Sequence, residues 1–222
     1  GPIFANVIFA DEINRPPPKT QAALLEAMQE HHVTAGGDTH PLDDPFFVLA
    51  TQNPIEQEGT YPLPEAQLDR FMLNVWLDYP SFDEEVEVVR STTAGAQAET
   101  EPVMTAEELR KYQSFVRQIP VADNVIEYAV QLVSRTRPDA AEAPDFITNY
   151  LSYGAGPRAS QYLVLGAKTL AALDGRMTPV EADVRRMAIP VLRHRIVPSF
   201  NAEAEDISSV DLIERLLDAD RT

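Results

Sequence analysis

The fold is decided by a stretch near the start of the chain, Val7-Ile8-Phe9-Ala10-Asp11-Glu12-Ile13-Asn14-Arg15. Its first four residues are apolar and include β-branched and aromatic side chains, which is typical of a buried parallel strand. The strand ends abruptly at two acids. A carboxylate at the carboxyl edge of such a sheet can reach a phosphate-bound Mg²⁺, since Mg²⁺ takes oxygen ligands and keeps several waters. The alternative is an acidic turn after a buried strand.

Two more segments have the character of strands, Phe46–Thr51 and Leu73–Leu77. The first is followed by Asn53. If its strand neighbours that of Asp11, the Asn53 amide would lie near the carboxylates, where it can hydrogen-bond a water or a phosphate. Asn before Pro is also a common turn residue, so this alternative stays open.

A helix is predicted over Lys19–Glu30, after a run of prolines, and a hairpin over His31–Pro41, around two glycines. Beyond Pro80 the sequence shows helical periodicity and no convincing strand. We therefore expect an α/β part over residues 1–79 and an all-helical part over residues 80–222.

Two arginines stand where a phosphate could be bound. Arg70 lies between apolar residues just before the third strand, and arginine suits the charge of a transferring phosphoryl group. A salt bridge to Asp69 or Glu65 is the alternative. Arg158 begins a helix behind the turn Gly154-Ala155-Gly156. A cation there opposes the helix dipole and needs an anionic partner, either a ligand or a nearby carboxylate.

A basic stretch lies further along the predicted helices. It can either meet an acidic neighbour or form a solvated helix face paired with Glu181 and Asp183. Its members are Arg176, Arg185, Arg186, Arg193 and Arg195.

Composition limits the possible functions. The 222 residues hold 18 Lys and Arg against 35 Asp and Glu, a net charge of −17. This balance argues against non-specific binding to nucleic acid or to an anionic membrane surface. No apolar run is long enough to span a bilayer. The chain has no Cys, which excludes disulfides and thiolate sites and fits a cytoplasmic location.

In order and spacing, several motifs closely resemble the MoxR-type AAA+ ATPases. The resemblance covers almost the whole chain and is most specific over residues 1–71. The motifs are Val7–Arg15, Gln21–Glu30, Ala50–Pro54, Leu63–Phe71, Pro157–Ser160 and Pro190–Arg195. The implied fold is α/β plus all-α: an incomplete AAA+ P-loop NTPase core with a parallel sheet, followed by a helical lid domain.

The resemblance also implies roles for five residues. Asp11 and Glu12 match the Walker B pair, which holds Mg²⁺ and activates water for ATP hydrolysis. Asn53 matches sensor 1. Arg70 matches the arginine finger, which acts on ATP held by a neighbouring subunit. Arg158 matches sensor 2, and the resemblance leaves open whether it acts in its own subunit or in the next. Such ATPases form homo-oligomeric rings, commonly hexamers, and remodel client proteins, often ones with a von Willebrand factor A domain.

One motif of the family is missing. A P-loop needs Gly-x-x-x-x-Gly-Lys-Ser/Thr to cradle the phosphates, and no such string occurs. In the family, the P-loop strand lies between the strands that match Phe46–Thr51 and Leu73–Leu77. Because the chain also begins at Gly1, we expect a fragment that is inactive on its own. The alternative function is a non-catalytic protein-interaction module.

Overall fold

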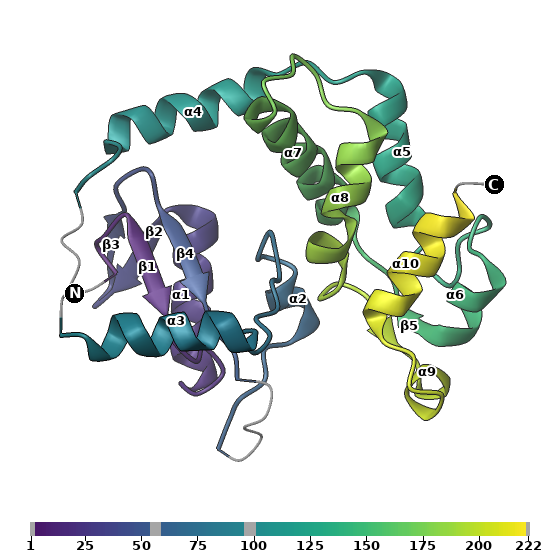
Figure 1. The fold of residues 1–222 in the computed structure, drawn as a ribbon, viewed down its shortest axis with the longest axis horizontal. Helices are drawn as coiled ribbons and strands as arrows, with labels where there is room; N and C mark the ends of the chain where they lie inside the picture. The colour runs from purple at the N-terminus through teal and green to yellow at the C-terminus, as the bar shows by residue number, and fades with distance from the viewer. Residues whose placement is uncertain (1–2, 54–58, 96–100, 221–222) are drawn as a thin grey trace.

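The structure is a computed structural model, and it describes residues 3–53, 59–95 and 101–220. Strands and short helices come first, and helices dominate from residue 82 onward (Figure 1). The elements are β1 (Val7–Ala10), α1 (Pro18–Glu30), β2 (His32–Ala35), β3 (Asp38–Pro41), β4 (Phe47–Ala50), α2 (Glu65–Leu68), α3 (Phe82–Thr93), α4 (Ala106–Gln118), α5 (Asp123–Ser134), α6 (Asp145–Tyr150), β5 (Leu151–Tyr153), α7 (Pro157–Leu173), α8 (Glu181–Leu192), β6 (Val197–Pro198), α9 (Phe200–Ala204) and α10 (Ser209–Ala219).

The first strand pair confirms the parallel strands predicted from the sequence, but the expectation that they are buried is wrong, because side chains on both strands are about half exposed. β1 and β4 are parallel neighbours, with Val7 opposite Phe47 and Ala10 opposite Ala50. Both strands therefore end at the same edge of the sheet, which brings the segments after Ala10 and Ala50 together.

The hairpin and the first helix also form where the sequence predicts them. β2 pairs with β3 in antiparallel register around Gly36 and Gly37. Both glycines have positive φ, 65° and 96°, which a two-residue hairpin turn requires and which glycine adopts without steric cost. α1 begins at Pro18, whose fixed φ suits a first helical turn.

The predicted third strand, Leu73–Leu77, is wrong, because the structure has no strand there. A strand needs a partner backbone, and the strand that the family places between this segment and β4 is not in the sequence. One backbone group of the segment is instead bonded to the lid, since Asn74 N donates to Pro190 O at 2.8 Å.

The strand faces show how little of the α/β core these residues can bury. Val7, Phe9, Phe47 and Leu49 are each between 48% and 64% exposed. Parallel sheets are ordinarily covered on both faces. The buried cluster of this part is small and centres on Ile13, Leu25 and Leu63.

The helical part has a large core of its own, built mainly from α5, α7, α8 and α10. α7 and α8 pack closely where Gly166 meets Met187, because a Cβ on Gly166 would lie 2.6 Å from Met187 Cε. α8 continues through Pro190 and ends two residues later. The antiparallel pair β5–β6 was not expected, because strands of two or three residues leave no periodicity to detect.

The described residues therefore form a small parallel sheet followed by a helical part, the architecture that the resemblance implies. The division between residues 79 and 80 stays a prediction. Within the described ranges, no helix is both long enough and apolar enough to cross a membrane.

Candidate functional site

The two acids after β1 are joined to the end of β4 through one hydroxyl group. Thr51 Oγ1 donates to Asp11 Oδ1 at 2.6 Å and accepts from Glu12 N at 2.9 Å. Ile13 N also donates to Thr51 O at 2.9 Å. The ends of the two strands are therefore locked together, as the sequence predicts, and the orientation of the Asp11 carboxylate is fixed.

Glu12 has an unusual backbone. Its φ is 49°, in the left-handed region that non-glycine residues rarely adopt and that is enriched at functional sites. Its side chain lies against Arg15, with Oε2 at 2.6 Å from Nε. Both side chains are partly exposed, so this ion pair is weak and can be exchanged for another partner.

Asn53 lies three residues beyond β4 and is half-buried. It therefore follows the same edge of the sheet as Asp11 and Glu12. One oxygen of Asp11 is committed to Thr51, and Mg²⁺ in nucleotide sites needs only one or two carboxylates beside phosphates and waters. The donor set fits such an ion. No cluster of three or more His, Asp or Glu suited to holding a metal occurs among the described residues.

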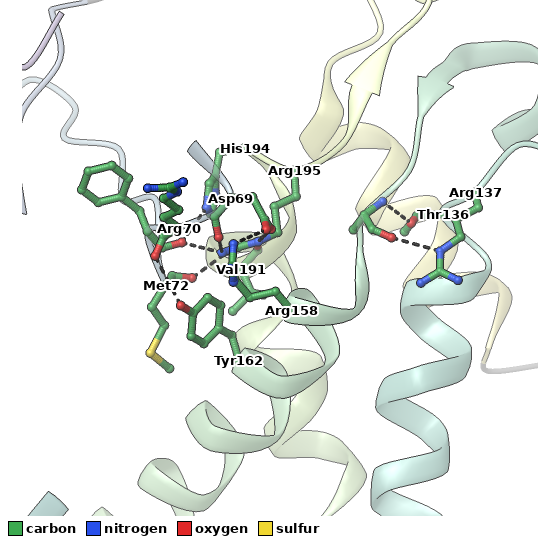
Figure 2. A network of polar contacts seen from close by, with 12 residues as sticks. Asp69, Arg70, Met72, Thr136, Arg137, Arg158, Tyr162, Val191, His194 and Arg195 are labelled. Carbon is green, nitrogen blue, oxygen red and sulfur yellow. Dashed lines mark hydrogen bonds and ion pairs between the residues drawn. The ribbon is translucent and has the colours of Figure 1, made fainter. Parts of the chain in front are cut away.

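Arg70 follows the short helix α2 and faces the lid with its backbone. Its carbonyl accepts a hydrogen bond from Tyr162 Oη at 3.3 Å. Its guanidinium makes no hydrogen bond or ion pair within the described ranges. The alternative of a salt bridge to Asp69 or Glu65 is therefore wrong for Arg70, and the cation is available to another partner (Figure 2).

Arg158 occupies the first turn of α7 and has the carboxylate partner that its position requires. Nη1 donates to Asp69 Oδ2 at 2.7 Å. This is a contact between the lid and the residue just before Arg70. Since a guanidinium carries five N–H donors, most donors of Arg158 are left for a second acceptor.

The glycine turn before Arg158 is held by the end of α5 (Figure 2). Thr136 Oγ1 accepts from Ala155 N at 2.9 Å, and Arg137 Nε donates to Ala155 O at 3.0 Å. Gly154 lies so close that an added Cβ would be 2.4 Å from Thr136 O. Only glycine fits there, so the turn fixes where α7 and Arg158 begin.

The strongest polar contact between the two parts was not predicted. Arg195 was placed in a basic stretch that faces solvent or an acidic neighbour, yet its side chain is only 1% exposed. It binds Asp69 and the backbone around it. Its position four residues after the buried Val191, one helical turn on, was the available signal.

Arg176 does pair with Asp183, as the second alternative expected.

His194 lies in the same contact and is neutral. Burial and the neighbouring Arg195 lower the pKa of His194 from 6.5 to about 4. Its Nε2 lies 3.1 Å from Phe71 O, so Nε2 carries the proton and donates it. Arg193, the residue just before His194, stacks over Trp76, with its Cζ 4.1 Å from the ring centroid. Trp76 is 68% exposed.

The structure therefore gathers the five predicted residues into two groups. Asp11, Glu12 and Asn53 follow the paired ends of β1 and β4. Arg70 and Arg158 lie on either side of Asp69, between the core and the lid.

Comparisons with known proteins match both parts of the chain. Residues 1–73 match the model of the ATPase family associated with various cellular activities, and residues 146–216 match that of the AAA lid domain. The chain is 42% identical to Chaperone MoxR1 of Mycobacterium tuberculosis over 98% of its own length and 57% of that protein. It is 41% identical to the uncharacterized protein YeaC of Bacillus subtilis, over 99% of the chain and 66% of YeaC.

A crystal structure of a Cytophaga hutchinsonii protein described as an ATPase superposes with a TM-score of 0.92 at 41% identity, over 98% of this chain and 66% of that one. The chain thus spans roughly three fifths to two thirds of these relatives. Core and lid models match in the expected order, and relatives at about 40% identity align over nearly every residue. The chain belongs to the MoxR family of AAA+ ATPases.

Proposed function

We propose that the parent protein of this chain hydrolyses ATP with Mg²⁺ and uses the energy to remodel client proteins. The observation that carries the proposal is the pair Asp11 and Glu12 at the end of β1, fixed through Thr51 to the strand that leads to Asn53. Oriented carboxylates at the carboxyl edge of a parallel sheet are suited to phosphate chemistry.

Each residue of the first group has a separate task. Asp11 binds the magnesium ion, which neutralises phosphate charge when bound. Glu12 orients the attacking water and accepts its proton, for which its carboxylate must leave Arg15. Asn53 hydrogen-bonds the water or the γ-phosphate through its amide.

The two arginines stabilise the charge of the transferring phosphoryl group. Arg70 does so for ATP held by the next subunit, and its unpaired guanidinium supports this role. The parent is therefore a homo-oligomeric ring, and a hexamer is the expected size. Arg158 contacts the nucleotide with the donors that Asp69 does not use.

The phosphate cradle must come from outside this sequence, which contains no P-loop motif. We propose that the rest of the parent supplies it and that the 222-residue chain alone does not hydrolyse ATP. The client is a protein, and one carrying a von Willebrand factor A domain is our first candidate. The cytoplasmic location expected from the sequence stays a prediction.

The second candidate function is a non-catalytic interaction module. It is favoured by the missing P-loop and by α3, whose Phe82, Val88 and Val89 are all more than half exposed. A pure interaction module has no use for an oriented Asp-Glu pair or an unpaired Arg70, so we rank it second.

Mixed rings of the full-length parent test the proposal. Arg70→Ala alone should lose turnover by about 10³-fold, the usual scale for an arginine finger. Mixed with Glu12→Gln subunits, which keep Arg70, the Arg70→Ala subunits should regain activity in their own sites. Arg90→Ala is the matched control, because Arg90 is 74% exposed and pairs only with Glu87 on α3. Absence of any ATP turnover by the wild-type parent, or no recovery on mixing, contradicts the proposal.

A further inference from the structure

Arg195, at the end of the α8 region, commits its whole guanidinium to the segment that carries Arg70. Nε donates to Asp69 Oδ1 at 2.9 Å, Nη2 to Asp69 O at 2.8 Å and to Phe71 O, and Nη1 to Met72 O at 3.2 Å. The remaining donor of Nη1 bonds to Val191 O in the last turn of α8. All five N–H donors of a guanidinium are therefore used (Figure 2).

These hydrogen bonds lie on both sides of Arg70 in the chain. Asp69 O precedes Arg70, and the carbonyls of Phe71 and Met72 follow it. The Arg70 carbonyl itself accepts from Tyr162 Oη, on α7. The backbone on both sides of Arg70 is thus bound by the lid, while its guanidinium is left free of described partners.

The contact is buried and specific to arginine. The Arg195 side chain is 1% exposed and lies 5.0 Å from the centroid of the Tyr162 ring. Lysine keeps the charge but offers three donors from one atom, so it cannot reach carbonyls spread over four residues. Residues 69–72 have no sheet partner among the described residues. The amides of Asp69, Arg70 and Phe71 bond to carbonyls of α2, whereas the carbonyls of residues 69–72 bond to the lid.

The same carboxylate also binds the other arginine of the site. Asp69 Oδ1 accepts from Arg195 and Asp69 Oδ2 from Arg158, the residue proposed to contact nucleotide. A change in the pairing of Arg158 therefore acts on the residue next to Arg70. This gives a direct physical link between the nucleotide side of the lid and the segment that reaches the neighbouring subunit.

We propose that Arg195 is a positioning residue for Arg70, through which the lid of one subunit sets the arginine finger offered to the next subunit's ATP. The inference rests on the proposed function, because it assigns a partner to the proposed role of Arg70. It predicts that Arg195→Lys, which keeps a cation beside Asp69, harms the neighbour's site more than the subunit's own site.

Complementation in rings of the full-length parent tests this. Arg195→Lys alone should lower kcat by about 10²-fold, the scale of a misplacement of about 1 Å. Mixed with Glu12→Gln subunits, which have intact Arg195 and Arg70 but no water-activating carboxylate, turnover should rise several-fold above that of either variant alone. A merely structural defect of the lid would damage the subunit's own site, and mixing would not restore it.

Three further mixtures serve as controls. The mixture of Arg70→Ala and Glu12→Gln is the reference for a defect in the arginine finger. Its ATP turnover should recover, because the Glu12→Gln subunits supply an intact Arg70. Asp11→Asn with Glu12→Gln should not recover, because both variants lose their own site. Arg193→Lys should keep wild-type turnover, because Arg193 belongs to the same run but stacks on Trp76 and does not touch residues 69–72.

The outcomes separate the two proposals. Recovery of ATP turnover when Arg195→Lys is mixed with Glu12→Gln supports the positioning role. If mixing restores the turnover of Arg70→Ala but not that of Arg195→Lys, the positioning role is overturned and the proposed function still stands. No recovery of either overturns the finger assignment and this inference with it. If Arg195→Lys does not fold, Tyr162→Phe, which removes only the hydroxyl that binds Arg70 O, is judged by the same recovery on mixing.

Discussion

Arg195 Nε lies 2.9 Å from Asp69 Oδ1, although the two residues are 126 positions apart in the sequence. Arg158 binds the other oxygen of that carboxylate at 2.7 Å. One aspartate of the core thus receives two cations from the lid. The relative placement of core and lid depends on this carboxylate more than on any exposed ion pair, because the Arg195 side chain is buried and cannot turn to water instead.

Asp69→Asn should therefore weaken the docking of the lid on the core. The amide keeps an oxygen for one arginine but loses the charge that compensates the buried guanidinium. We expect a loss of about 1–2 kcal/mol in the free energy of unfolding, measured by urea denaturation of the full-length parent. Asp174→Asn is the control. Asp174 pairs with Arg176 and Arg186 at the surface, where such pairs contribute about 0–1 kcal/mol. Equal effects of the two substitutions would contradict the central role of Asp69.

His194 should make this contact sensitive to acid. Burial lowers its pKa to about 4, whereas the unfolded chain has the ordinary value of 6.5. The unfolded state therefore binds the proton more readily, and stability is lost as the pH falls from 6.5 towards 4. At pH 5 the expected loss from this group is about 2 kcal/mol relative to pH 7.5.

His194→Gln isolates that contribution, because glutamine can donate to Phe71 O but does not titrate. Urea denaturation at pH 7.5 and at pH 5 should show a larger loss for the wild type than for His194→Gln. Carboxylates titrate in both proteins, so only the difference between them counts. The same pH dependence in both proteins would show that His194 is not held neutral by the fold.

Gly154→Ala should destabilise the lid strongly, because its Cβ would lie 2.4 Å from the backbone oxygen of Thr136. Backbone must shift to relieve the clash, at a cost of about 1–3 kcal/mol. Gly156→Ala is the matched control two residues on, where a Cβ meets no atom within 4 Å. Thermal unfolding should give a clearly lower Tm for Gly154→Ala alone. A comparable Tm for the two variants would contradict the close approach of the turn to α5.

Thr51→Val tests how the two acids are oriented. Valine matches the shape of threonine but lacks the hydroxyl that binds Asp11 Oδ1 and Glu12 N. Groups that orient a metal ligand are commonly worth about 10–100-fold in metal affinity or activity. The Mg²⁺ concentration for half-maximal ATP turnover of the full-length parent should rise on that scale. Thr51→Ser keeps the hydroxyl and should behave as the wild type; if Thr51→Val does so too, the hydroxyl has no part in orienting Asp11.

The sequence predicts the elements whose signals are local. β1 and β4 follow from short apolar runs, the hairpin from Gly36 and Gly37, and the starts of α3 and α4 from Ser81 and Thr105, which form capping boxes. The prediction of a third strand fails because a strand needs a neighbouring strand, and residues 73–77 have none among the residues that the structure describes.

The candidate site likewise contains residues that the sequence can place and residues that it cannot. Asp11 and Glu12 can be placed from the sequence, because a strand end fixes them. The burial of Arg195 has only a weak sequence signal, its spacing from Val191, because a short basic run has the same local pattern whether it faces water or a buried carboxylate. Its partners, residues 69–72, are more than 100 positions away, and only the tertiary fold brings them within hydrogen-bonding distance.

The most direct test of the account is ATP binding and turnover by the full-length parent with Glu12→Gln. The account predicts that the variant binds ATP and Mg²⁺ as the wild type does and loses about 10²–10⁴-fold in kcat, because the amide cannot accept the proton of the attacking water. Glu107→Gln, which removes only an exposed i,i+4 pair with Lys111, should keep full turnover. Retained turnover in Glu12→Gln would remove Glu12 from the chemistry, and failure of the wild-type parent to bind ATP would favour the non-catalytic interaction module.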